Sequence, residues 1–141
     1  MNPSQIRLVQ DSFAQLAPDA DLLADLLCAR LFQLEPSLRT RLPNDLQETK
    51  ADIVRLLTES VQKLDRPGEW QPALRQIGIE TGIGTYLRNY QVFGTALIWT
   101  LEKGMGEEFT FEMLEAWVAF YSALTGAMQE TDAQAKKMAN A

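Results

Sequence analysis

The 141-residue sequence contains no histidine. Imidazole is the side chain that most often serves as a general base near neutral pH, as a metal ligand and as an axial ligand of haem iron. Its absence means that no imidazole can fill any of these three roles, which excludes much ordinary enzyme chemistry. The single cysteine, Cys28, likewise excludes an intramolecular disulfide framework and a thiolate-rich metal site, and it favours a reducing compartment.

Positive charge is also scarce, since 13 Lys and Arg stand against 19 Asp and Glu. The net charge of −6 leaves no basic stripe to neutralise phosphates, so we expect no nucleic-acid partner. Residues 1–5 lack the basic flank and apolar run of a signal peptide, and no apolar stretch approaches the length of a membrane span. We therefore expect a cytoplasmic protein with no membrane partner.

What is present is the composition of one globular domain over residues 1–141, with 46% hydrophobic and 23% charged residues. Prolines occur only up to position 72, and apolar residues recur at spacings of three and four with no strand-like alternation. The spacing predicts an all-α domain of six or seven helices. The expected helices span 3–17, 19–36, 45–65, 72–79, 87–101 and 110–131, with a single turn between 36 and 43. The tail 132–141 has little to bury and is expected to fray.

Three segments resemble those of a globin, in particular the bacterial haemoglobin type that occurs alone or fused to flavin reductases. Residues 30–39, Arg-Leu-Phe-Gln-Leu-Glu-Pro-Ser-Leu-Arg, resemble the end of the second globin helix and its proline-started third. Residues 90–101, beginning Tyr-Gln-Val-Phe-Gly, resemble the penultimate helix, and Glu-Ala-Trp at 115–117 with Tyr121 resembles the last. The likeness covers roughly residues 5 to 132 and implies a globin-like fold.

On the proximal side, the resemblance implies a haem ligand that this chain lacks. Counting back from Tyr90, Gly82 and Gly84 match the glycines of the family, and Glu80 stands where the family has its proximal histidine. A carboxylate supports a different iron chemistry from imidazole, and burying it unpaired is costly. Either the phenol of Tyr90 donates to Glu80 and holds it in place, or Glu80 is solvated and Tyr90 is a core residue.

On the distal side, the same comparison finds further departures. Thr49 stands where the family commonly has glutamine, and Leu42 replaces a phenylalanine that wedges against haem. Residues 26–29 offer no counterpart of the distal tyrosine. These losses together predict relaxed haem requirements, no haem cofactor and no reversible oxygen binding. The competing hypothesis is a gas-binding haem protein with Glu80 or Tyr90 as axial ligand.

A vacated haem pocket has to be filled, because protein interiors are close-packed. Either side chains or another apolar ligand takes the space, and each candidate lining residue is equally well explained as plain core. The candidates are Leu27, Leu42, Ile53, Leu57, Ile79, Ile83, Leu87 and Leu97. Haem-less globin domains that this arrangement resembles serve as sensor or signalling modules, some of them holding a fatty acid.

We therefore predict a haem-free regulatory, sensory or partner-binding protein, with an apolar-ligand carrier as a further alternative. Trp99 and Trp117 could be exposed on the last two helices and form a homodimer interface there, or both could be core. The acidic residues at the start of the last helix favour its positive end and do not indicate a metal. No nucleophile and base pair or phosphate cradle is visible, so we expect no enzyme activity.

Overall fold

The computed structural model describes residues 1–86 and 90–139, and all of their side chains except those of 84, 85, 90, 130–136, 138 and 139. Every regular element in these ranges is helical, which confirms the predicted all-α class. The elements are α1 (Pro3–Leu16), η1 (Ala17–Asp19), α2 (Ala20–Leu34), α3 (Ser37–Thr40), α4 (Leu46–Gln62), α5 (Pro67–Thr81), α6 (Ile83–Tyr86), α7 (Tyr90–Met105), η2 (Gly106–Glu108) and α8 (Phe111–Ala139). Six of these are long helices, while α3 and α6 are four-residue turns.

Side-chain caps fix the first residues of several helices. Asn2 and Gln5 form a reciprocal capping box at the start of α1. The Asp45 carboxylate accepts from the Glu48 amide at 2.8 Å and begins α4, and the Thr110 hydroxyl accepts from the Met113 amide and begins α8. Capping residues can be recognised in the sequence itself, which is why the starts of these helices were predictable.

The helix expected at 72–79 is in fact longer, and the prediction of its start was wrong. Pro67 occupies the first turn of α5, and the amides of Glu69 and Trp70 both donate to the carbonyl of Arg66. Proline is favoured at a helix start because its φ is already helical. Pro72 lies inside the helix, and the Trp70 indole donates to the carbonyl of Ser60 at 2.8 Å, which joins the start of α5 to the end of α4.

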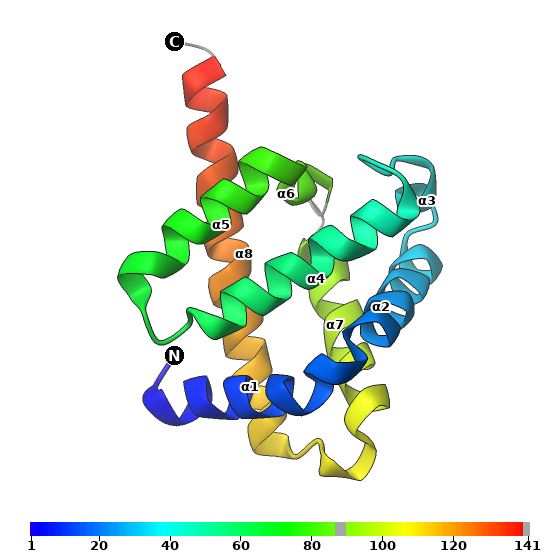
Figure 1. Cartoon of the computed structure of the whole chain (residues 1–141), viewed down its shortest axis with the longest axis vertical. Helices are drawn as coiled ribbons and strands as arrows, with labels where there is room; N and C mark the ends of the chain where they lie inside the picture. The colour runs from blue at the N-terminus through cyan, green and yellow to red at the C-terminus, as the bar shows by residue number, and fades with distance from the viewer. Residues whose placement is uncertain (87–89, 140–141) are drawn as a thin grey trace.

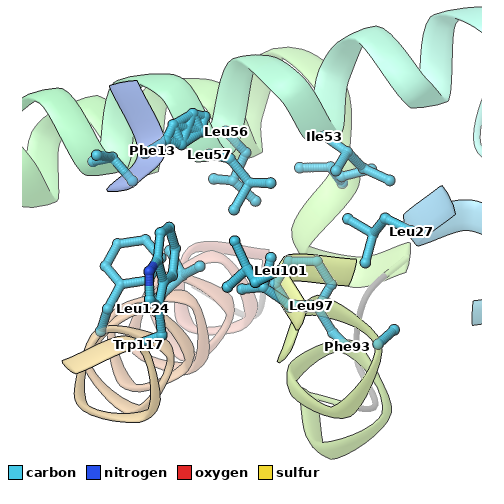
Figure 2. Packing of buried hydrophobic residues seen from close by; sticks show 14 of the residues in the cluster. Phe13, Leu27, Ile53, Leu56, Leu57, Phe93, Leu97, Leu101, Trp117 and Leu124 are labelled. Carbon is cyan, nitrogen blue, oxygen red and sulfur yellow. The ribbon is translucent and has the colours of Figure 1, made fainter. Parts of the chain in front are cut away.

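The core lies between α4 on one side and α7 and α8 on the other (Figure 2). In this view Ile53, Leu56 and Leu57 point from α4 toward Leu97 and Leu101 of α7. Helix α1 crosses and packs against α8, and α2 packs against α7, so the first and last helices of the described chain are neighbours. Helices α4 and α5 run side by side in front of α7 and α8 (Figure 1).

Trp117 is a core residue, which decides between the two alternatives for this side chain in favour of burial. It is 1% exposed, its ring meets Phe120 edge-on at 5.3 Å, and its indole donates to the Ser12 hydroxyl at 2.9 Å. Burial with a satisfied N–H is the usual state of a core tryptophan. Trp99 is half-buried, with the Arg30 guanidinium 5.0 Å and the Lys103 ammonium 5.7 Å from its ring.

Helix α8 continues as far as Ala139, and its last turns extend beyond the body of the molecule (Figure 1). Fraying of residues 132–141 stays a prediction, and residues 140 and 141 lie outside the described chain. Among the described helices, none combines the length and the apolar character that a membrane crossing requires.

Candidate functional site

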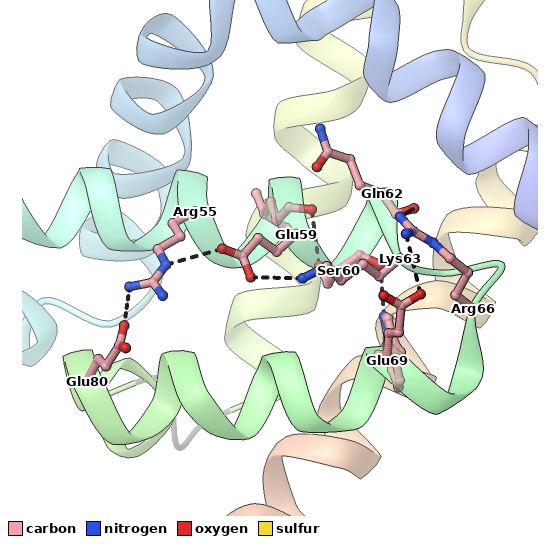
Figure 3. Close-up of polar contacts among 10 residues, drawn as sticks. Arg55, Glu59, Ser60, Gln62, Lys63, Arg66, Glu69 and Glu80 are labelled. Carbon is pink, nitrogen blue, oxygen red and sulfur yellow. Dashed lines mark hydrogen bonds and ion pairs between the residues drawn. The ribbon is translucent and has the colours of Figure 1, made fainter.

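Glu80 lies near the end of α5, with its carboxylate toward α4 and toward solvent (Figure 3). One carboxylate oxygen lies 2.6 Å from the Arg55 guanidinium of α4, and the other accepts from the Gln76 amide at 2.8 Å. The hydrogen bond from Gln76 and the adjacent Arg55 lower the pKa of the Glu80 carboxyl from its ordinary value. Glu80 is thus an ionised surface group that joins α5 to α4.

The helix around Glu80 ends at Gly82, whose φ of +69° lies in the left-handed region. Only glycine adopts this conformation without strain, so Gly82 is the C-cap that the sequence requires there. The side chain of Tyr90 lies outside the described residues, so its predicted hydrogen bond to Glu80 stays a prediction. Both carboxylate oxygens of Glu80 already have other partners.

Thr49, Leu42 and three of the candidate lining residues lie on the inner side of the fold. Thr49 is fully buried on α4, and its hydroxyl donates to the Asp45 carbonyl at 3.0 Å, which satisfies its only proton locally. Ile53 and Ile83 are fully buried, Leu27 is 1% exposed, and Leu42 is half-buried against the core.

Ile79 is the exception among the candidate lining residues, and its assignment was wrong. Its side chain is 70% exposed, whereas Ile77, two positions earlier, is fully buried. The buried row of α5 runs through Leu74 and Ile77, and a residue two positions further on points almost to the opposite side of a helix. Leu87 lies outside the described residues.

Four of the predicted lining residues do surround a cavity, which measures only about 30 Å³. It lies among α1, α2, α4 and α7 and includes Leu27, Ile53, Leu57 and Leu97 in its wall. Small-molecule sites have volumes of about 300–1,000 Å³. A water molecule needs about 10–15 Å³ of such space, so this cavity has room for no more than about three, and its apolar wall offers a water no partner.

Tyr86, on α6, is a site residue that sequence reasoning missed. It is 8% exposed, and its phenol donates to the backbone carbonyl of Leu38 in α3 at 2.8 Å. Burial, with a further contribution from Cys28, raises the pKa of Tyr86 to about 12, so the phenol keeps its proton. The sequence shows an aromatic residue six positions after Glu80. A single helical turn is too short for hydrophobic periodicity to indicate whether the Tyr86 side chain is buried or exposed.

Cys28 shares this interior. It is 2% exposed on α2, and burial raises the pKa of its thiol to about 11. A thiol in that state is neutral near pH 7 and a poor metal ligand or nucleophile. Cys28 is therefore a small core residue.

Among the described side chains, the carboxylate, phenol and thiol candidates do not present a free donor to a haem iron. An axial ligand has to face the interior and present an unshared donor. Of the described candidates, Glu80 faces solvent in an ion pair, the Tyr86 phenol is bonded to Leu38, and the Cys28 thiol is protonated. Nor do the described residues bring three carboxylate or thiol side chains together as a metal site.

No family model matches the chain. The chain is similar to neuroglobin of Danio rerio, with 24% identical residues over 136 aligned residues that cover 86% of each protein. The bacterial type within the globins stays a prediction. The similarity over most of the chain, together with the helical architecture, makes this a globin-like protein of all-α fold.

Proposed function

We propose that this globin-like protein works without haem, in regulation, sensing or the binding of a partner, and that it is not an enzyme. The observation that carries the proposal is the position of Glu80 in a chain with no histidine. The residue at the expected ligand position directs its carboxylate outward into contacts with Arg55 and Gln76. To reach an iron, it would have to leave both partners and enter an apolar interior, which is unfavourable for a charged group.

The small cavity argues against the carrier alternative. A fatty acid needs a site many times larger than about 30 Å³, and the wall of this cavity includes the buried side chains of Leu27, Ile53 and Leu97. We therefore favour a filled interior and a role that is exercised at the surface.

A haemin titration tests the proposal. Purified protein is mixed with haemin and the absorbance is followed in the Soret region. We expect a broad band without stoichiometric saturation, as for non-specific adsorption. A sharp band that saturates at one haemin per chain, with a defined axial ligand, would overturn the proposal. Protein isolated from its own host should carry no tetrapyrrole.

We also propose that the partner is a second copy of this chain, bound along the exposed face of α8. Phe111 is 68% and Val118 is 43% exposed, and both lie on one side of the helix with the exposed Glu115 and Gly126. Glu115 precedes Gly126 by as many residues as Lys137, also exposed, follows it. An antiparallel pair of α8 helices that crosses at Gly126 therefore places each Glu115 opposite the Lys137 of the other copy.

Sedimentation of charge variants tests this dimer. Glu115→Lys and Lys137→Glu each create like-charge contacts and should shift the protein toward monomer, while the double exchange restores the pairing and the dimer. Asp11→Lys, an exposed acid on α1, is the control. A wild-type protein that remains monomeric at high concentration, or a double exchange no better than the single variants, would contradict the proposed pairing.

A further inference from the structure

The space between α4 and α5 is closed by contacts from the chain itself. At one end, the Trp70 indole of α5 is bonded to the Ser60 carbonyl of α4. At the other, the Arg55 guanidinium of α4 meets the Glu80 carboxylate. Two helices joined at both ends in this way leave no room for a flat group between them unless a contact opens, and a close-packed interior needs side chains to fill the remaining volume.

Tyr86 supplies such a side chain from α6, which contacts both α4 and α5. It follows α5 by one turn, next to the fully buried Ile83, and its own ring is buried. Its phenol reaches α3, where it donates to the Leu38 carbonyl at 2.8 Å across 48 residues of sequence. The side chain thus spans from the segment after α5 to the segment before α4.

The Leu38 carbonyl depends on the Tyr86 phenol for a hydrogen-bond donor. A helix leaves its last four carbonyls without intrahelical amide partners, and α3 has only four residues. Leu38 is itself 4% exposed, so little water reaches it. Losing the phenol would leave a buried acceptor unpaired, which makes the closed position of Tyr86 the stable one.

We propose that Tyr86 is an internal plug, which takes the place of a bound group and excludes haem and other flat apolar ligands from the space between α3, α4 and α6. This inference rests on the proposed haem-free function and adds a second barrier, which is steric and independent of the missing imidazole. Any ligand has to displace Tyr86 first, so its apparent affinity is reduced by the small fraction of molecules that are open.

The first test separates the two barriers with haemin. Four proteins are titrated: wild type, Glu80→His, Tyr86→Ala and the double variant. We expect only the double variant to give a saturating one-to-one Soret band. Any haemin binding by Glu80→His should be at least about tenfold weaker. Equal binding by Glu80→His alone, or no binding by the double variant, would overturn the plug.

The second test uses benzene, which needs no axial ligand. Benzene should raise the melting temperature of Tyr86→Ala, because a ring-sized cavity is open, and leave that of Tyr86→Phe unchanged, because the ring remains. Tyr86→Val replaces Tyr86→Ala if the latter does not fold. An equal shift in Tyr86→Phe and Tyr86→Ala, or none in the smaller variants, overturns the inference. Stoichiometric haemin binding by the wild type would refute both the haem-free function and the exclusion of haem by Tyr86, whereas a failed benzene test with no haemin binding by the wild type would refute the role of Tyr86 alone.

Discussion

Gly94 allows α7 to lie directly against an aromatic ring of α8, and its replacement by alanine is expected to destabilise the protein. A Cβ at position 94 would lie 2.8 Å or less from three ring carbons of Tyr121. Contacts this short force the ring or the helix to move, and overpacking of this kind costs about 1–3 kcal/mol. Alanine in a helix recovers about 0.5–1 kcal/mol relative to glycine. The net loss should therefore be up to about 2.5 kcal/mol, with a central value of about 1 kcal/mol.

Gly68→Ala is the matched control. A Cβ at position 68 in α5 would meet nothing within 4 Å, so only the favourable effect of alanine remains. We expect a gain of about 0.4–1 kcal/mol in the free energy of unfolding. Urea denaturation followed by circular dichroism at 222 nm measures the free energy of unfolding of both variants. In thermal denaturation, each kcal/mol of that free energy should move the melting temperature by roughly 3 °C.

A double variant identifies the cause. Tyr121→Ala removes the ring that Gly94→Ala contacts, so the cost of Gly94→Ala should fall by at least about 1 kcal/mol in that background. Equal stability of Gly94→Ala and Gly68→Ala would refute the reasoning, as would an undiminished cost in the absence of the ring.

Three further results are expected. Trp117→Phe removes the donor to Ser12 and should lower the free energy of unfolding by about 1–3 kcal/mol, and an unchanged urea midpoint would contradict the role of this bond. Glu80→Gln should be less stable than wild type at pH 7: because the folded-state pKa of Glu80 is lowered, the advantage of the wild type is present above the ordinary value of 4.5 and is lost as pH falls through the lowered value. A difference in urea midpoint that persists well below that pH would argue against the Arg55 and Gln76 contacts. Cys28, with a thiol pKa of about 11, should react with iodoacetamide at pH 8 only after denaturation, since about one thiol in a thousand is ionised at that pH; rapid labelling of the folded protein would show that it is accessible.

Sequence reasoning succeeded where the determinant was local. Asn2, Asp45 and Thr110 cap helices because their side chains reach amides three residues away, so the helix starts could be deduced without the fold. The inward face of α5 was also available, since Trp70, Leu74 and Ile77 are spaced by four and three. That phase places Ile79 outside, although isoleucine is a residue type more often found in a core.

Tertiary contacts set the rest and could not be deduced in the same way. The partner of Glu80 is Arg55, on another helix, and the partner of Tyr86 is a backbone carbonyl 48 residues away. A backbone carbonyl has no sequence signature. Whether Trp117 is buried likewise depends on α1, where Ser12 provides the acceptor for its indole.

The pairing of α1 with α8 also determines when the protein can fold during synthesis. The apolar face of α1, which includes Val9 and Phe13, emerges from the ribosome early, but Trp117 and Leu124 emerge more than a hundred residues later. At about 5–20 residues per second, roughly 5–20 s pass before the covering helix exists. Throughout that interval the nascent chain presents an uncovered hydrophobic helix, which is the kind of surface that chaperones bind.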